Sequence, residues 1–386
     1  MKKQTVMGIM SGTSLDGVDY VLCEISISNI KLKKLWGISY PRELRKNLFL
    51  AASGNLGSHA LGQLNHDLGR FYAKHARAYS CDYVGLHGQT IFHNPAPNVG
   101  ATFQLGEPAY LAAKLKVPVV NQFRTMDLAL GGQGAPLATI FHRAVFSHPG
   151  KNIAVNNLGG ISNVTFLPKS GRQYLSFDTG PANILIDLAA KKLSRGKLEF
   201  DKQGQWASQG IPNSYLVKKW IEQSRFFKTS PPKSTGREEF GEEFLNKALA
   251  ACKKEDRFDF KMNNADIMAT MTEFTAESIA DSYEKFLPQW PDVVILCGGG
   301  AANPTLVKAI RRALRQRQWQ GTEGKLDRPI DVTVSDALGW PTQSIEASAF
   351  AYLAYLTMNN IPGNIPETTG ARRRAILGQI VPYAEL

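Results

Sequence analysis

Short apolar runs alternate with longer segments of helical spacing along the chain. The apolar runs are rich in β-branched residues and bounded by Gly, Asn or Asp, which is the pattern of buried strands. We predict strands at residues 5–9, 19–27, 83–87, 117–121, 153–158, 164–167 and 293–297. Apolar residues recur with helical spacing in segments 61–80, 181–192, 241–253, 265–286, 304–316 and 348–355. Alternation of this kind predicts the α/β class.

A glycine-rich turn between two apolar strands occurs twice. The first begins at residue 5, in TVMGIMSGTSLDGVDYVLCEI, and the second at residue 152, in NIAVNNLGGISNVTFL. Glycine lets the backbone fold tightly and approach a ligand closely at such turns. The repeat favours two similar α/β domains facing one cleft; the alternative is a pair of unrelated hairpins.

Composition narrows the class of protein. With 386 residues, 43% of them hydrophobic and 20% charged, the chain suits a folded protein of two or three domains. The 45 Lys and Arg residues against 33 Asp and Glu give a net charge of +12, which favours anionic partners without naming one. No apolar run is long enough for a membrane span, and the four cysteines lack metal-ligand spacing. We therefore expect a reduced, cytoplasmic protein that does not bind membranes.

Two basic clusters are candidates for a nucleic-acid-binding surface. They comprise Arg311, Arg312, Arg315 and Arg317 in one predicted helix, and residues 372–374. Neither cluster is interleaved with aromatic residues, and no nucleic-acid-binding motif accompanies them. We interpret both as solvated surface and expect no nucleic-acid partner.

The first glycine-rich turn reads Gly12-Thr13-Ser14-Leu15-Asp16-Gly17. Its backbone N–H groups and the hydroxyls of Thr13 and Ser14 could cradle phosphate oxygens. Asp16 or Asp19 could hold Mg²⁺, usually through water. The standard P-loop and kinase glycine-loop patterns are absent, so a nucleotide site here is of another kind. An ordinary tight turn is the alternative.

Asp178 lies in FDTGPAN, where we expect a strand to end and a helix to begin near Pro181. Catalytic groups of α/β proteins occupy such strand ends. A carboxylate there could act as general base toward water or a hydroxyl, and helix capping is the alternative. Gly298-Gly299-Gly300 forms another strand-to-helix junction, at which the chain can pass close to adenine or ribose.

Further polar residues stand beside Gly or Pro in the first half of the chain. They include His87, Gln89, Arg124 and Asp127. Such groups suit a polyhydroxylated or carboxylate-bearing ligand, because the guanidinium fork of Arg124 matches a carboxylate. Residues 233–238, KSTGRE, offer another cationic loop.

In combination these motifs resemble the anhydro-N-acetylmuramic acid kinase family. The matching stretches run from residue 8 to about residue 378 in the expected order and are GIMSGTSLDGVD, GLHGQTIFHNP, FRTMDLALGGQGAPL, NLGGISNV, FDTGPAN, KSTGREEF, CGGGAANPTL and GNIPETTGA. The resemblance implies two ribonuclease-H-like domains of the actin-like ATPase fold that flank a nucleotide-binding cleft. It implies a first domain of residues 1–128 plus 345–386 and a second of residues 129–344.

The same resemblance implies roles for individual residues. The expected ATP-binding residues are Gly12, Thr13, Ser14, Leu15, Asp16, Gly17, Val18, Asp19, Gly159, Gly160, Asn163, Gly298, Gly299 and Gly300. The expected sugar-binding residues are His87, Gln89, Arg124, Asp127 and Glu346. Asp178 is implied as the catalytic base and Asp16 as a Mg²⁺ site acting through water. The family also suggests a homodimer.

The family reaction combines hydrolysis and phosphorylation of 1,6-anhydro-N-acetylmuramic acid. Water attacks the anomeric carbon with help from Asp178, the bridge opens, and O6 receives the γ-phosphoryl group of MgATP. The products are N-acetylmuramic acid 6-phosphate and ADP, in recycling of the bacterial cell wall. One departure is Gln122 in place of an expected Asp before Phe123 and Arg124, which bears on substrate affinity.

Three alternatives stay open at this point. An ordinary sugar kinase would phosphorylate a free hydroxyl. A nucleotide-dependent assembly protein or chaperone would need long insertions or a separate peptide-binding module, and neither is evident in the sequence. A nucleic-acid binder rests only on the net charge.

Overall fold

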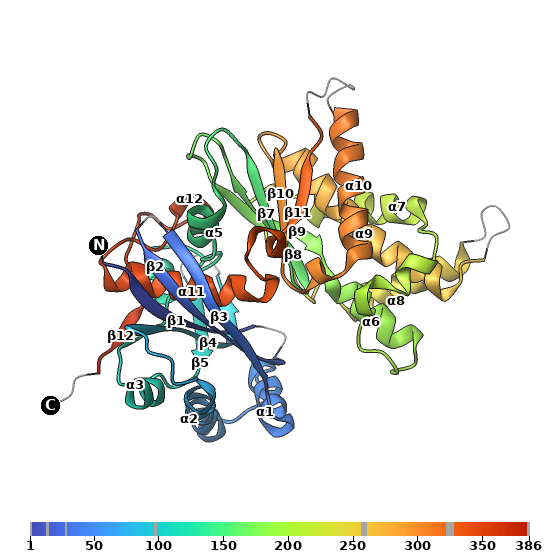
Figure 1. Ribbon diagram of the computed structural model, residues 1–386. Helices are drawn as coiled ribbons and strands as arrows, with labels where there is room; N and C mark the ends of the chain where they lie inside the picture. The colour runs from blue at the N-terminus through green and yellow to red at the C-terminus, as the bar shows by residue number, and fades with distance from the viewer. Residues whose placement is uncertain are drawn as a thin grey trace. The chain divides into compact units, whose positions relative to one another are not determined.

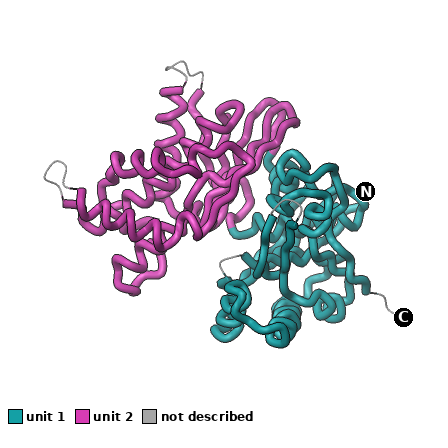
Figure 2. Tube along the Cα trace, turned by 180° about the vertical axis from the view of Figure 1, so that it is seen from behind, with its two compact units in different colours: residues 1–146, 343–386 teal, residues 147–342 magenta. Residues whose placement is uncertain are grey.

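The structure, a computed structural model, describes residues 2–12, 15–27, 29–95, 99–255, 261–321 and 328–383. The chain forms two compact units, shown in Figure 2: unit 1 is residues 1–146 with 343–386, and unit 2 is residues 147–342. We expected the first boundary at 128/129. It falls later because α5 (Thr139–Phe146) packs on α11 (Ile345–Met358), which is part of unit 1.

Unit 1 is built on one mixed sheet, with strand order β12-β6-β4-β1-β2-β3 and β5 paired to β4. The strands are β1 (Gln4–Ser11), β2 (Gly17–Ser26), β3 (Asn29–Ser39), β4 (Tyr83–Asn94), β5 (Ala101–Leu105), β6 (Val119–Asn121) and β12 (Gln379–Val381). The helices besides α5 and α11 are α1 (Arg42–Ala52), α2 (Ser58–His75), α3 (Ala109–Leu115), α4 (Thr125–Ala129) and α12 (Pro366–Thr369).

Glycines bring α11 unusually close to the unit 1 sheet, across which it lies in Figure 1. A methyl group on Gly8 of β1 would overlap the backbone carbonyl of Ala347, and one on Gly85 of β4 would overlap that of Phe350. The neighbouring β1 residues Met7 and Ile9 point to the other face and join the core that α1, α2 and α3 cover. The sheet is therefore covered on both faces.

Unit 2 holds a five-stranded sheet of order β11-β10-β7-β8-β9. Its strands are β7 (Ile153–Leu158), β8 (Ile161–Leu167), β9 (Leu175–Pro181), β10 (Val293–Cys297) and β11 (Asp331–Val334). Its α-helices are α6 (Asn183–Leu193), α7 (Ser214–Gln223), α8 (Glu242–Lys254), α9 (Asn264–Phe286) and α10 (Pro304–Gly321). An Asn263–Asp266 capping box fixes the start of α9, the longest of these helices, which packs lengthwise on α10.

The two sheets share one topology. In each, three antiparallel strands follow one another (β1–β3 and β7–β9), and two later strands extend the sheet in parallel from the first of the three. β4 and β6 do so in unit 1, and β10 and β11 in unit 2. Two unrelated hairpins would not give this match, so that alternative is excluded.

The arginine cluster of α10 is only partly the solvated face that was predicted: Arg312 and Arg315 are exposed, but all four arginines also have partners in the fold. Arg311 and Arg315 donate to the backbone oxygens of Val332 and Ile330. Arg312 pairs with Glu273, and Arg317 contacts three carboxylates of α9. Helix α9 supplies the opposite charge that the sequence pattern could not assign. Within the described part of the chain, no helix is long and apolar enough to cross a membrane.

Candidate active site

The first glycine-rich turn connects β1 to β2 in unit 1. Thr13 and Ser14 lie outside the described residues. Leu15 and Val18 are buried in the core, so their side chains serve packing and only their backbone could face a ligand. Leu15 has a positive φ of 56° and donates its N–H to the oxygen of Gly12 at 3.3 Å, which keeps the turn tight.

A buried chain of hydroxyls supports this turn from below. The Ser11 hydroxyl lies 2.8 Å from that of Tyr72, which lies 3.2 Å from that of Tyr40. Tyr40 donates to Gln89 Oε1 at 3.3 Å, and Gln89 Nε2 donates to the oxygen of Gly12 at 2.9 Å. Gln89, predicted to contact the sugar, is fully buried. Its observed contacts hold the turn in place.

Three carboxylates gather beside the same turn. Burial, followed by the nearby charges of Asp16 and Glu346, raises the pKa of Asp19 to about 6. Glu346, at the start of α11, is exposed. An excess of negative charge at this place fits a divalent cation held through water. No group of three or more His, Cys, Asp or Glu side chains among the described residues is arranged to ligate a metal directly.

His87 and Arg124, both predicted to contact the sugar, lie together in unit 1. The His87 Nδ1–H donates to the oxygen of Gly88 at 2.7 Å, which leaves Nε2 to accept from Arg124 Nη2 at 2.9 Å. Burial, followed by the Arg124 charge, holds the pKa of His87 well below its usual range, so the ring is neutral. Arg124 Nη1 donates to the oxygen of Gly134 at 2.8 Å. His87 and Gly134 thus fix the guanidinium.

Asp127 is fully buried, and both of its carboxylate oxygens are engaged by the chain. Oδ2 accepts from the N–H of Gly134 at 2.8 Å, while Oδ1 accepts from Asn364 Nδ2 at 2.9 Å and from the Thr369 hydroxyl at 2.8 Å. The carboxylate therefore ties the glycine loop after α4 to the segment around α12. These contacts show that Asp127 shapes this loop, and its predicted contact with the sugar stays a prediction.

Gln122, the departure from the family pattern, has a positive φ of 54°. Asp and Asn adopt such a conformation more readily than a longer side chain does. The departure therefore lies at a backbone position, next to Phe123 and Arg124, where the expected Asp would adopt the positive φ more readily than Gln does.

The second glycine-rich turn, Gly159-Gly160, connects β7 to β8 in unit 2. Its carbonyls accept from the start of α6: the Asn183 N–H donates to Gly159 at 3.0 Å, and the Ala182 N–H to Gly160 at 2.9 Å. The Asn183 side chain also donates to the oxygens of Leu158 and Gly159. Helix α6 thus holds the turn.

The three glycines after β10 pack on the same turn. Gly298, with φ of 77°, and Gly300 each lie so close to Asn157 or Leu158 of β7 that a methyl group would collide. A methyl group on Gly299 would meet only Asn183 Nδ2, at 3.9 Å. Two of the glycines therefore serve chain packing, and Gly299 has open space beside it.

Asp178 lies within β9, directly opposite Asn163 of β8. Helix α6 begins at Asn183, and its N-cap residue Ala182 makes no side-chain cap. The helix-capping alternative and the placement of Pro181 in the helix were therefore wrong. Asp178 Oδ2 accepts the backbone N–H of Thr235 at 2.9 Å. Burial raises the pKa of Asp178 to about 6, although this N–H and the Lys233 charge act in the opposite direction.

Residues that sequence reasoning missed surround these groups. They are Ser11, Tyr40, Tyr72, Asn183, Lys233 and Thr235. Lys233 and Thr235 lie in the KSTGRE stretch, which was read only as a cationic loop. The tyrosines carried no local signal, because their contacts join strands and helices distant in sequence.

A duplicated α/β unit with a glycine-rich turn in each copy defines the class of the actin-like ATPases. The chain belongs to the anhydro-N-acetylmuramic acid kinase family, whose sequence profile matches residues 4–383. It is 40% identical to the anhydro-N-acetylmuramic acid kinase of Microcystis aeruginosa, over 97% of this chain and 99% of that protein. It is also 40% identical to the enzyme of that name from a Picosynechococcus species, over 98% and 100%.

Two solved structures that match this chain are distant in sequence. A ROK family glucokinase from Streptomyces griseus, in complex with glucose and AMPPNP, matches with a TM-score of 0.38 and 12% identity over 90% of this chain and 97% of that one. A ROK family protein from Streptococcus pneumoniae, in complex with sucrose, matches with a TM-score of 0.38 and 14% identity over 92% and 99%. Neither supports an inference about substrate.

Proposed function

We propose that this protein is an ATP-dependent kinase that opens the 1,6-anhydro ring of anhydro-N-acetylmuramic acid with water and phosphorylates O6. The products are N-acetylmuramic acid 6-phosphate and ADP. Membership of the family supports the substrate and the reaction. The observation that supports the mechanism is Asp178, a partly exposed carboxylate on a strand, held through one oxygen and with a pKa raised to about 6.

In this reaction Asp178 accepts a proton from the attacking water. The water oxygen bonds to the anomeric carbon, the bond from that carbon to O6 breaks, and O6 takes the phosphoryl group. A carboxylate with a pKa near 6 is largely ionised at neutral pH yet more basic than an ordinary Asp, which suits a general base. When MgATP is bound, ATP supplies the phosphoryl group and Mg²⁺ neutralises the negative charge of the phosphates.

The remaining groups divide by unit. In unit 1, Asp16 and Asp19 would hold Mg²⁺ through water, because the cluster they form with Glu346 is rich in negative charge. Arg124 and Glu346 are the groups proposed to meet the sugar, and His87 fixes Arg124. In unit 2, Gly159, Gly160, Asn163 and Gly299 are proposed to meet the nucleotide. We also propose a cytoplasmic homodimer, as the family resemblance suggests.

The test is an ATP-coupled assay on anhydro-N-acetylmuramic acid, with mass analysis of the product. We expect ADP release and a product heavier than the substrate by one water and one phosphoryl group. A product heavier by the phosphoryl group alone would instead establish an ordinary sugar kinase. Reaction in ¹⁸O-water, stopped before anomeric exchange, should place the label at C1. Absence of label at C1 would contradict the hydrolytic step.

A further inference from the structure

A short strap of chain, residues 233–235, holds Asp178 from both its backbone and its side chain. The backbone N–H of Asp178 donates to the oxygen of Lys233 at 3.2 Å. The N–H of Thr235 donates to Asp178 Oδ2 at 2.9 Å. Within the described part of the chain, no hydrogen bond is seen at Oδ1. The strap therefore holds the backbone of Asp178 and one carboxylate oxygen, and leaves the other oxygen for a proton.

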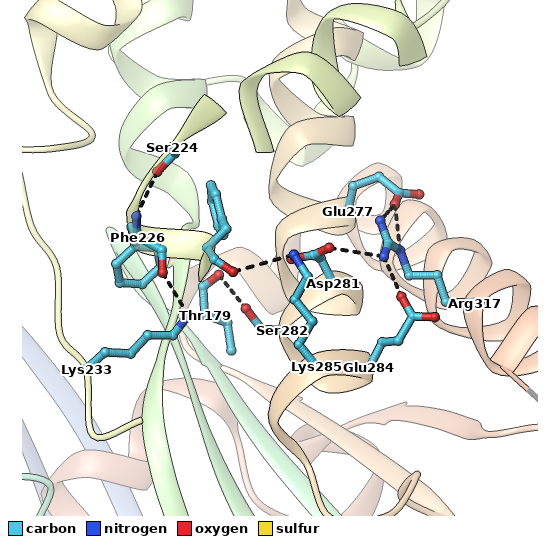
Figure 3. A network of polar contacts seen from close by, with 11 residues as sticks. Thr179, Ser224, Phe226, Lys233, Glu277, Asp281, Ser282, Glu284, Lys285 and Arg317 are labelled. Carbon is cyan, nitrogen blue, oxygen red and sulfur yellow. Dashed lines mark hydrogen bonds and ion pairs between the residues drawn. The ribbon is translucent and has the colours of Figure 1, made fainter. Parts of the chain in front are cut away.

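The side chain of Lys233 anchors this strap. Its ammonium group lies 4.3 Å from the centroid of the Phe226 ring, 4.2 Å from that of Phe286 and 5.9 Å from that of Phe177. It also donates to the backbone oxygen of Phe226 at 3.2 Å, as Figure 3 shows. A cation between aromatic faces is attracted by their quadrupoles, more strongly when water is excluded. Since Phe177 directly precedes Asp178, the lysine also contacts the strand that carries the carboxylate.

The anchor points are themselves braced. Lys285 of α9 donates to the oxygen of Phe227 at 3.5 Å, next to the carbonyl that Lys233 uses in the 3-10 helix η3 (Phe226–Lys228). It also pairs with Asp281 at 2.7 Å, and Asp281 contacts Arg317 of α10 at 3.2 Å. Figure 3 shows this series of contacts. The aromatic box around Lys233 is therefore connected, through Lys285 and Asp281, to helices α9 and α10.

The Lys233 ammonium group points toward aromatic rings and a backbone carbonyl. It therefore differs from a surface lysine, whose ammonium group is free to bind phosphate. A structural lysine far from the site would also be tied down in this way, but this one carries the two backbone groups that bracket Asp178. We propose that Lys233 is a positioning residue: its ammonium group, held between the aromatic rings, anchors the strap that orients the Asp178 carboxylate. This inference rests on the proposed role of Asp178 as the base.

Charged groups around the strap give the proposal a pH signature. Burial is the main cause that lowers the pKa of Lys233 to about 8; Lys285 acts in the same direction, while Asp281, Asp178 and Glu239 oppose it. Around Asp178, the Lys233 charge lowers the pKa and Glu238 raises it. The lysine is therefore charged below about pH 8 and loses its charge above it. The carboxylate is ionised above about pH 6, so the strap should work between these two values.

The experiment measures kcat/KM against pH for the full-length wild-type protein, Lys233→Met and Lys233→Arg, on anhydro-N-acetylmuramic acid and MgATP. Methionine keeps a flexible apolar stem and removes the cation; arginine keeps a cation that stays charged. We expect Lys233→Met to lower the plateau by about 10²-fold, which is the cost of a misplacement near 1 Å. Its acidic limb should move to higher pH. Lys233→Arg should restore most of the plateau and extend it above pH 8.

Lys228→Met is the matched control, because Lys228 is an exposed lysine in η3 next to the box. It should keep the wild-type profile. A Lys233→Met profile with wild-type limbs and kcat/KM within about twofold of wild type would overturn the proposal. A melting temperature lowered with unchanged limbs would also overturn it, since that pattern reports folding alone. If Lys233→Met does not fold, Lys233→Arg provides the test. Loss of the basic limb near pH 8 in Lys233→Arg would support the proposal, and retention of that limb would overturn it.

Asp178→Asn in the same assay separates this inference from the proposed function. Wild-type turnover in Asp178→Asn would refute Asp178 as the base, and the strap would then have nothing to position. Loss of turnover in Asp178→Asn with an unaltered Lys233→Met would refute the strap alone.

Discussion

Asp19 in unit 1 and Asp178 in unit 2 both have a pKa raised to about 6, but their surroundings differ. Burial is the main cause in each case. Around Asp19 the next causes are two further carboxylates, Asp16 and Glu346, which repel its charge. Around Asp178 the next causes are a backbone N–H and a lysine, which favour its charge. One folding unit used twice thus holds two carboxylates of similar basicity in opposite electrostatic settings.

The difference indicates two kinds of chemistry. A carboxylate among carboxylates is relieved by a cation, which matches a Mg²⁺ site. The Asp178 carboxylate is held by the strap through one oxygen, and its other oxygen has no chain partner among the described residues. That oxygen can accept a proton, as a general base must. The supports differ as well: buried hydroxyls and the Gln89 amide hold the turn in unit 1, while the start of α6 and close glycine packing hold it in unit 2.

The largest effect should come from Asp178→Asn. The amide cannot accept the proton of water, so kcat should fall by about 10³-fold, within the range for loss of a general base. ATP binding, measured by calorimetry, should stay near the wild-type affinity. In the wild type, kcat/KM should fall as the pH drops below about 6, because the carboxylate becomes protonated. Turnover of Asp178→Asn near the wild-type rate would contradict the assignment.

The next largest effect concerns the close packing of α11 on unit 1. Gly8→Ala places a methyl group against the backbone carbonyl of Ala347, which cannot move without shifting the helix. We expect a loss of about 1–3 kcal/mol in the free energy of unfolding, measured by urea denaturation. Gly62→Ala is the control: nothing lies within 4 Å of that methyl group in the exposed middle of α2. It should stabilise the protein slightly. Equal effects of both changes would contradict the packing argument.

Much of the fold could be predicted from the sequence. The buried strands β7 and β10 match their predicted bounds, because continuous apolar runs between Gly, Asn and Asp leave little choice. The helices α8, α9 and α10 begin within one residue of prediction. Strand β3 was missed because it is an edge strand rich in lysine, including Lys31, Lys33 and Lys34, and so lacks a buried pattern.

The site was less predictable than the fold. Glycine turns and Asp178 gave local signals, but the Thr235 N–H that holds the Asp178 carboxylate is 57 residues away in the chain. Two of the three partners of the Asp127 carboxylate, Asn364 and Thr369, are 237 and 242 residues away. A sequence shows which polar residues stand beside glycines. It does not show which of them the fold will bury and hydrogen-bond within the chain. In this structure Gln89 and Asp127 are such residues. Only the tertiary contacts separate residues that shape the site from those available to a ligand.

The smallest effect should come from Asp19→Asn, and it tests the unit 1 side of the comparison. Removal of one carboxylate from the cluster of Asp16, Asp19 and Glu346 leaves less negative charge for a cation, so the Mg²⁺ concentration for half-maximal rate should rise about tenfold, a change of about 1.4 kcal/mol. Asp178→Asn should leave the Mg²⁺ dependence of ATP binding unchanged, because its carboxylate lies among an N–H and a lysine. Glu43→Gln, which removes an exposed carboxylate on α1, controls for the change in net charge. An unaltered Mg²⁺ requirement in Asp19→Asn would show that the two carboxylates do not differ in this respect, and the assignment of the cation to unit 1 would fail.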